Sequence, residues 1–147
     1  MFRIALLSLL LSCPAALMAA DKSPGVFHLT VEVSGVRNAR GRLMVTLYAS
    51  EDNWLDYEKY HRTRRVPAVK GRMTFRFAGL QPGTYGVAIL HDENANGEMD
   101  MQWLPPGPAE GAAASNQAPA RFGPPKWKDA RMQLDKNHRI SLPMDYP

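Results

Sequence analysis

Phe27-His28-Leu29-Thr30-Val31-Glu32-Val33 alternates apolar and polar side chains. An alternation with period two puts the two sets of side chains on opposite faces of a β-strand, so this segment predicts a strand that is buried on one face. The same alternation recurs in Arg42–Tyr48, and Met73–Phe77 and Gly83–Leu90 are predicted as a third and a fourth strand. The last of these begins after Leu80-Gln81-Pro82, a turn sequence in which proline presets φ and the following glycine accepts a positive φ.

Two shorter segments, Ala130–Leu134 and Arg139–Leu142, are expected to pair with each other around a turn at Asp135–Asn137. Between the second and third predicted strands, Ser50 is expected to cap a short helix that begins at Glu51. About seven short strands separated by turns are typical of two packed sheets. The sequence therefore predicts an all-β fold, an antiparallel β-sandwich.

One segment does not fit this pattern. No strand or helix period is visible from His91 to Asp129, and six of the twelve prolines lie between Pro105 and Pro125. A loop of this length inside a compact domain is uncommon unless it has a function, so we expect one long ordered loop. Trp103 and Trp127 flank its proline-rich part. Buried tryptophans would pin the loop to the sandwich, whereas exposed ones are able to stack on a sugar ring.

The N-terminus has the features of a secretory signal peptide. Arg3 supplies a positive charge, Ile4–Leu11 is apolar, and small residues lead to an expected cleavage site near Ala20 and Asp21. The apolar stretch is shorter than the ~20 residues that span a bilayer. We therefore expect residues 1–20 to be a leader and residues 21–147 to be a single β-sandwich domain that is periplasmic or secreted and does not span a membrane.

Cys13 is the only cysteine of the chain. A lipoprotein-type cleavage just before Cys13 is the competing interpretation of the leader, and Pro14 directly after the cysteine disfavours it. Removal of the leader leaves no thiol in the mature chain. Disulfides, thiol nucleophiles and zinc–thiolate sites are therefore excluded.

Charge is unevenly distributed along the chain. The composition, with 45% hydrophobic and 22% charged residues, fits a globular domain, and the net charge is +4. From Phe77 to Ala120 the chain contains no lysine or arginine, yet it contains five acids: Asp92, Glu93, Glu98, Asp100 and Glu110. A bound cation is the simplest reason for an acidic block in a basic protein.

The acidic block contains a calcium-loop pattern. Residues 92–100, Asp-Glu-Asn-Ala-Asn-Gly-Glu-Met-Asp, match the first nine positions of such a loop, with Gly97 at the sharp turn. The twelfth position, which is normally a bidentate carboxylate, is Trp103, so a dissociation constant of only ~10⁻⁴–10⁻³ M is expected. The predicted ligands are side-chain oxygens and, at Glu98, a backbone carbonyl: Asp92, Asn94, Asn96, Glu98 and Asp100. A turn that forms without any ion is the alternative, because Asn and Gly accept left-handed conformations.

Two other groups of residues could carry chemistry. His91 precedes the loop and could act as a general base, although a histidine beside a turn is more often structural. The segment Lys59–Arg65 is basic, and in an exported protein Arg62, Arg64 and Arg65 could contact anionic polymers of the envelope rather than nucleic acid. The alternative is an edge strand that is kept soluble by its arginines.

Three blocks of the sequence carry a family resemblance. These are Gly79–Tyr85, His91–Gly97, and Phe122–Pro125 ahead of Asp129, together with Glu110-Gly111 and Ser115-Asn116. They resemble family 2141 of the domains of unknown function, which are small bacterial secreted proteins. The resemblance implies a prealbumin-like or immunoglobulin-like β-sandwich, and it implies no activity or catalytic residue. Ala112–Ala114 depart from the family pattern, which usually has a glycine and an aromatic residue there.

These observations favour an exported, non-enzymatic module of the cell envelope that binds a ligand or partner and has a calcium-binding type of loop. No serine elbow or phosphate-binding glycine loop is present. Two alternatives stay open. One is a purely structural or accessory envelope domain, and the other is a hydrolase that uses His91 or the carboxylates of the loop.

Overall fold

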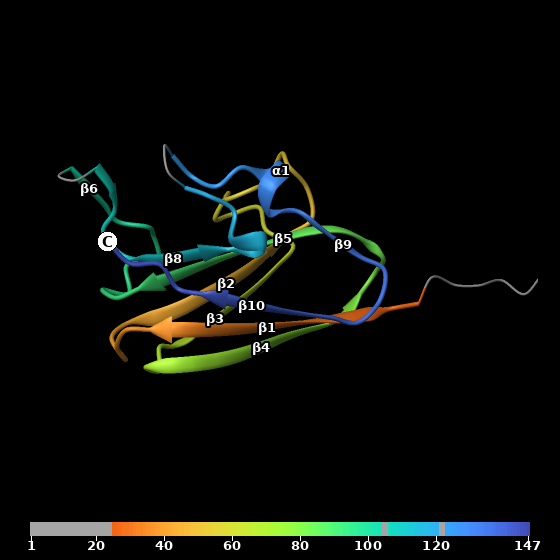
Figure 1. The fold of residues 1–147 in the computed structure, drawn as a ribbon, viewed down its shortest axis with the longest axis horizontal. Helices are drawn as coiled ribbons and strands as arrows, with labels where there is room; N and C mark the ends of the chain where they lie inside the picture. The colour runs from red at the N-terminus through yellow and green to blue at the C-terminus, as the bar shows by residue number, and fades with distance from the viewer. Residues whose placement is uncertain (1–24, 104–105, 121–122) are drawn as a thin grey trace, which may run out of the picture.

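The first strand lies in the middle of a three-stranded sheet. In the computed structural model, which describes residues 25–103, 106–120 and 123–147, β1 spans Phe27–Val36 (Figure 1). It pairs with β4 (Gly71–Leu80) in antiparallel and with β10 (His138–Pro143) in parallel orientation. The expected leader, including Cys13, lies outside the described residues.

The second sheet is built around β5 (Gly83–Asp92). Its strand order is β3 (Arg62–Pro67), β2 (Arg42–Tyr48), β5 and β8 (Gly111–Ala114), all antiparallel neighbours. A further short strand, β9 (Met132–Leu134), pairs with the beginning of β5. Figure 1 shows the two sheets stacked face to face.

The core lies between the two sheets and comes from the alternation seen in the sequence. Leu29, Val31 and Val33 of β1 are at most 1% exposed, and Leu43, Val45 and Leu47 of β2 are fully buried. Phe75 and Phe77 of β4 and Val87 and Ile89 of β5 complete one continuous apolar cluster. The predicted all-β sandwich is confirmed, with ten strands in the described residues instead of about seven.

The end of the chain differs from the prediction. Met132–Leu134 and His138–Pro143 do not pair with each other, because β9 joins β5 in one sheet and β10 joins β1 in the other. The chain crosses between the sheets at residues 135–137, so β10 runs in the same direction as β1. Pattern reasoning detects strands but not which strands become neighbours, and a short turn between two of them favoured the wrong pairing.

The expected loop is ordered but is not devoid of secondary structure. It contains the hairpin of β6 (Met101–Trp103) and β7 (Pro106–Pro108), then β8, a 3₁₀ turn at Ser115–Gln117 and a helical turn, α1 (Trp127–Ala130). Among the described residues, no helix is long and apolar enough to cross a membrane. The helix expected at Glu51 is a series of turns, in which the Trp54 N–H donates to the Glu51 carbonyl at 3.0 Å.

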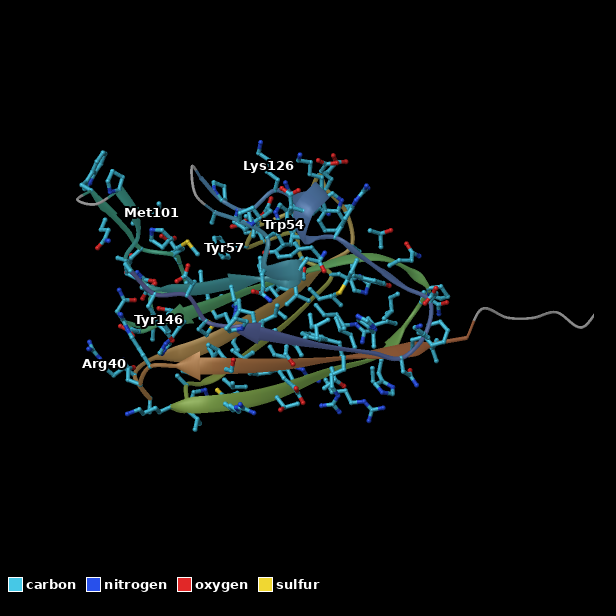
Figure 2. The ribbon with its side chains drawn as sticks, viewed as in Figure 1. Arg40, Trp54, Tyr57, Met101, Lys126 and Tyr146 are labelled. Carbon is cyan, nitrogen blue, oxygen red and sulfur yellow. The ribbon has the colours of Figure 1, made fainter. Side chains whose placement is uncertain are left out.

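The second sheet is covered on its outer face as well. Met44, Tyr48 and Leu90 point away from the sandwich core, yet they are at most 4% exposed. The Trp54 ring packs on Tyr48 and on Trp127 of α1, at centroid distances of 5.2 and 5.5 Å. The Trp54 indole N–H donates to the Pro125 carbonyl at 2.7 Å. Loops therefore form a third layer above this sheet (Figures 1 and 2).

Gly86 is required where this layer meets the sheet. A β-carbon at residue 86 would lie 2.8 Å from Cζ3 of Trp127 and 2.9 Å from Cζ3 of Trp54. We predict that Gly86→Ala lowers the free energy of unfolding by about 1–3 kcal/mol, because two packed indole rings must move. Urea unfolding measures the loss. Gly83→Ala on the same strand is the control, since its β-carbon would make only ordinary contacts at 3.6 Å or more. An equal loss in both variants would contradict the prediction.

Candidate functional site

The calcium-type loop begins at a buried carboxylate. Asp92 is the last residue of β5 and is 1% exposed. Its Oδ1 accepts a hydrogen bond from the Asn96 N–H at 3.0 Å, and its Oδ2 accepts one from the Gly97 N–H at 2.8 Å. The loop is thus folded back over the carboxylate at its start. Gly97, with φ of +86°, permits the sharp turn that this requires.

Asp100 closes the loop from its other end. Its Oδ2 accepts a hydrogen bond from Asn94 Nδ2 at 2.6 Å, and its Oδ1 accepts one from Asn96 Nδ2 at 3.0 Å. The amide oxygens of Asn94 and Asn96 accept backbone N–H groups of the same loop, at 3.0 and 2.9 Å. Four of the five predicted ligand residues, Asp92, Asn94, Asn96 and Asp100, therefore belong to one hydrogen-bonded unit.

The fifth predicted residue, Glu98, is placed differently. Its backbone N–H donates to Asn96 Oδ1, and its exposed side chain lines a groove beside the loop. Within the described part of the chain, no three His, Cys, Asp or Glu side chains are grouped so that they could hold a metal ion. Amide oxygens of Asn94 and Asn96 would therefore have to contribute to any calcium site. Calcium binding stays a prediction.

Glu110 is a part of the loop's framework that the motif did not identify. This side chain is 5% exposed. Its Oε1 accepts a hydrogen bond from the Glu93 N–H at 2.8 Å, and its Oε2 accepts one from the Asp100 N–H at 3.4 Å. Glu110 thereby joins the beginning and the end of the loop. The sequence marks Glu110 as a member of the acidic block. It does not predict the contacts of Glu110 with the backbone of Glu93 and Asp100, because these residues are distant in the chain.

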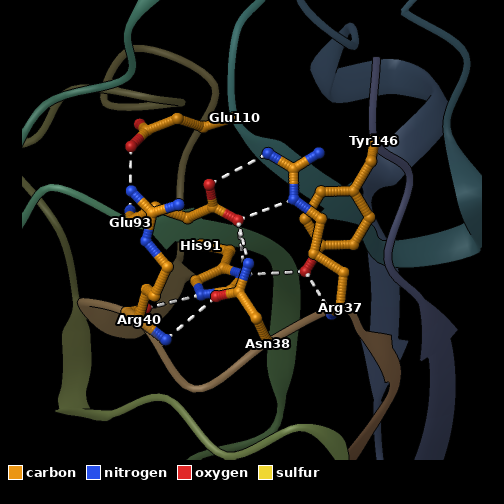
Figure 3. Close-up of polar contacts among 7 residues, drawn as sticks. All are labelled: Arg37, Asn38, Arg40, His91, Glu93, Glu110 and Tyr146. Carbon is orange, nitrogen blue, oxygen red and sulfur yellow. Dashed lines mark hydrogen bonds and ion pairs between the residues drawn. The ribbon is translucent and has the colours of Figure 1, made fainter.

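A polar cluster around a buried histidine lies at the base of the loop (Figure 3). The His91 ring is fully buried. Its Nε2 is 2.8 Å from the Arg40 carbonyl, which can only accept, so Nε2 carries the proton. Nδ1 then accepts from the Tyr146 hydroxyl at 2.7 Å, and that hydroxyl accepts from the Arg37 N–H at 3.1 Å. Both nitrogens of His91 are therefore occupied within the fold.

Glu93 and Arg37 form the charged part of this cluster. Arg37 donates from Nε and Nη2 to the two Glu93 oxygens, at 2.6 and 2.9 Å, and Asn38 Nδ2 donates at 2.9 Å. The hydrogen bonds from Arg37, followed by the one from Asn38, lower the pKa of Glu93 to about 2. The Arg37 guanidinium also lies over the Tyr146 ring, 4.6 Å from its centroid. The cluster fastens the β1–β2 turn and the C-terminal segment to the end of β5.

Two glycines make this cluster possible. A β-carbon at Gly41, where φ is +63°, would lie 1.9 Å from the Asp92 carbonyl oxygen. A β-carbon at Gly111 would lie 2.1 Å from the Tyr146 ring. The β1–β2 turn therefore crosses directly over the start of the loop, and Tyr146 packs directly on the backbone of β8.

The three arginines of the basic segment do not form one patch. In the register of β3 with β2, Arg62 and Arg64 face the same side as Leu47 and Val45, whereas Arg65 faces the opposite side with Met44. The Arg62 guanidinium donates to the carbonyls of Ala78 and Gly79 on β4. β3 is the last strand of its sheet. Inward-pointing charges at such an edge discourage pairing with other chains, as the edge-strand interpretation expects.

The two tryptophans of the long loop have opposite environments. Trp127 is 7% exposed and packs under Trp54, so it pins the loop to the sheet. Trp103 is 90% exposed on the β6–β7 hairpin. Of the two roles that the sequence left open, Trp127 is the buried anchor. Trp103 is exposed, so its ring is available for contact with another molecule.

An open groove of about 660 Å³ lies beside the calcium-type loop. One wall comes from the turns after β2, Leu55–Glu58, and the other from the loop itself, Asn96–Met99, with Arg65 of β3 also lining it. Tyr57 is 38% exposed there. Figure 2 places Tyr57 on the same side of the sandwich as Trp54 and Met101. No sequence pattern predicted this groove, because its walls are far apart in the chain.

Comparison with known proteins gives one match. The model of a family described as "Uncharacterized protein conserved in bacteria (DUF2141)" matches residues 31–141. No curated protein matches the chain significantly. No solved structure matches it significantly either. The matched region contains the whole calcium-type loop and both walls of the groove.

The lowered pKa of Glu93 leads to a pH-dependent prediction. Because its pKa falls from an ordinary value of 4.5 to about 2 on folding, the charged form stabilises the fold fully above about pH 4.5. This contribution is lost as the pH falls towards about 2. We therefore predict that Glu93→Gln is less stable than the wild type near neutral pH, and that the difference narrows between these two pH values. Urea unfolding in EDTA measures it.

Glu51→Gln is the control for this experiment, because Glu51 is exposed outside the cluster. It should leave the stability nearly unchanged across the same pH range. A stability difference for Glu93→Gln that stays constant down to about pH 2 would contradict the prediction. It would show that the ion pair with Arg37 does not lower the pKa of Glu93.

Proposed function

The chain belongs to the DUF2141 family, and we propose that it is a non-enzymatic ligand-binding module of the cell envelope whose loop at residues 92–100 binds calcium. The observation that carries the proposal is the meeting of Asp92, Asn94, Asn96 and Asp100 in one loop beside an open groove. Carboxylate and amide oxygens are ligands that calcium accepts in flexible geometry.

The surroundings of the loop support a binding role. Asp92 and Glu110 are buried and hold the backbone of the loop from both ends. A cation between Asp100 and the two asparagines would displace the amide N–H groups that now donate hydrogen bonds to Asp100. Both side-chain amides would then have to rotate so that their oxygens face the cation. Such a change would alter the groove wall at Asn96–Met99 directly. Calcium and ligand binding would then be coupled, because the loop forms part of both sites.

The environment of His91 argues against a hydrolase that uses His91 as its general base. A general base must reach the proton that it removes. His91 is fully buried, and both of its ring nitrogens are hydrogen-bonded inside the fold. This arrangement supports a structural role for His91 and favours a binding protein over an enzyme.

The proposed envelope location rests on the leader that the sequence predicts. We predict that exported protein begins within a few residues of Asp21, because the small residues before it are suited to signal-peptide cleavage. Cell fractionation and mass spectrometry of the mature N-terminus measure this. Protein that keeps Met1, or that carries a diacylglyceryl group on Cys13, would contradict a cleaved and unanchored form.

Calcium should raise the melting temperature of the protein. Binding to the folded state alone stabilises by about 2.7 kcal/mol at a hundredfold excess over the dissociation constant. With the weak affinity expected here, the titration must reach tens of millimolar at constant ionic strength. Magnesium should have a much smaller effect, because it demands a near-ideal octahedron. Thermal unfolding monitored by circular dichroism measures both responses.

A pair of variants makes the calcium test specific. Asp100→Asn removes a proposed side-chain ligand and should abolish most of the calcium-dependent shift. Glu98→Gln removes the same charge from the same loop but keeps the backbone carbonyl, so it should retain most of the shift. If the wild type responds equally to both metals, or if the two variants behave alike, residues 92–100 form only a turn.

A further inference from the structure

We propose that the groove between residues 55–58 and 96–99 binds an uncharged oligosaccharide, with one sugar ring stacked on Tyr57. This inference rests on the proposed function, because the calcium-type loop supplies one of the two walls. It adds the chemical class of the ligand, which neither the family nor the loop motif assigns.

The shape of the groove suits a segment of a chain molecule. Its volume of about 660 Å³ lies within the range of small-ligand sites, ~300–1,000 Å³. The groove is open along the surface and does not enclose its contents. An oligosaccharide can therefore lie along it with further sugar units extending beyond both ends.

Tyr57 gives the groove an aromatic surface in a polar setting. Tyr57 is 38% exposed and lines the groove. Burial and the nearby charges of Glu110 and Glu98 raise the pKa of the Tyr57 hydroxyl. A ring that is apolar on its face and polar at its edge matches a sugar, whose C–H groups lie on one face and whose hydroxyls lie around the rim.

The polar lining provides hydrogen bonds of both kinds. Arg65 donates, Glu58 and Glu98 accept, and all three side chains are exposed. Planar groups of this kind pair with neighbouring hydroxyls of a sugar. The groove also lacks the deep apolar pockets with which peptide side chains are usually held, since its apolar lining consists of Leu55, Tyr57 and Met99.

The charge of the groove disfavours polyanions. Three acids, Asp56, Glu58 and Glu98, line it against one cation, Arg65. Asp56 is partly neutralised by Lys59 at 3.3 Å, but the balance stays negative. An acidic polysaccharide or a nucleic acid would be repelled, whereas a neutral sugar would not. The envelope polymers that the sequence suggested for Arg62, Arg64 and Arg65 are therefore not the ligands of this groove.

Each wall is held in an unusual backbone conformation. Leu55 has φ of +62° and Ala95, next to Asn96, has φ of +59°. Residues other than glycine rarely adopt this region, and such conformations persist where the surrounding structure imposes them, often at binding sites. The turn at Leu55 fixes the direction in which the chain presents Tyr57 two residues later.

The test measures binding to three uncharged probes by calorimetry, with calcium present: chitotetraose, cellotetraose and maltotetraose. We expect the wild type to bind at least one of them. Tyr57→Ala should weaken that binding by about tenfold or more, and Tyr57→Phe should keep most of it because the ring remains. In the absence of calcium, polygalacturonate, an acidic polysaccharide, should bind more weakly than the neutral probe. Thermal unfolding verifies that each variant is folded.

Tyr60→Ala is the matched control, because Tyr60 is also 38% exposed but lies outside this groove. It should leave the affinity nearly unchanged. Binding to none of the three uncharged probes would overturn the inference. So would a loss caused by Trp103→Ala but not by Tyr57→Ala, which would move the contact to the β6–β7 hairpin. Tighter binding of polygalacturonate, or of a peptide, would also overturn it. The calcium-dependent shift in melting temperature is measured separately. A failure of the sugar-binding inference can therefore be distinguished from a failure of the proposed calcium binding.

Discussion

The structure depends on β5 being covered on both faces. Residues 85–92 of this strand are buried almost without interruption, because one face lies on the core between the sheets and the other lies under a layer of loops. An antiparallel sheet usually leaves one face to solvent, with apolar and polar residues alternating. Here Val87-Ala88-Ile89-Leu90 is a continuous apolar run, which is the pattern of a strand enclosed on both sides. The turns after β2 and the segment with α1 must therefore pack on the sheet, with Trp54 and Trp127 as their anchors.

The same burial explains the polar cluster at the end of β5. The strand ends in His91 and Asp92, which stay buried on opposite faces. A buried polar group that lacks a hydrogen bond costs free energy, so each of these side chains needs partners from the surrounding segments. Arg40, Tyr146, and the backbone of Asn96 and Gly97 provide them. In the part of the chain that the structure describes, no buried side-chain nitrogen or oxygen lacks a partner.

The groove lies where two parts of the loop layer do not meet. Trp54 and Trp127 close the layer over Gly86, and farther along the sheet the wall at Leu55–Glu58 stands apart from the wall at Asn96–Met99. Each wall is tied to a rigid element, because the first follows Trp54 directly and the second is held by Asp92 and Glu110. A site built on such supports needs little ordering when a ligand binds, which favours affinity. A change in the loop would be transmitted to the groove without any movement of the sandwich.

The sequence alone was sufficient to predict the sandwich and the calcium-type loop, because both are written in local patterns. The period-two alternation in β1 and β2 marks strands with one apolar face. The spacing of Asp92, Asn94, Asn96 and Asp100 brings these residues into one hydrogen-bonded loop. The tertiary structure decided four other features. These are the parallel pairing of β1 with β10, the closing contact from Glu110, the groove at Tyr57, and the cluster of Arg37, His91, Glu93 and Tyr146. Each of them joins residues that are distant in the chain. No local pattern predicts such a contact, because it depends on which strands become neighbours. It also depends on close approaches to the backbone at Gly41 and Gly111, where there is no room for a side chain.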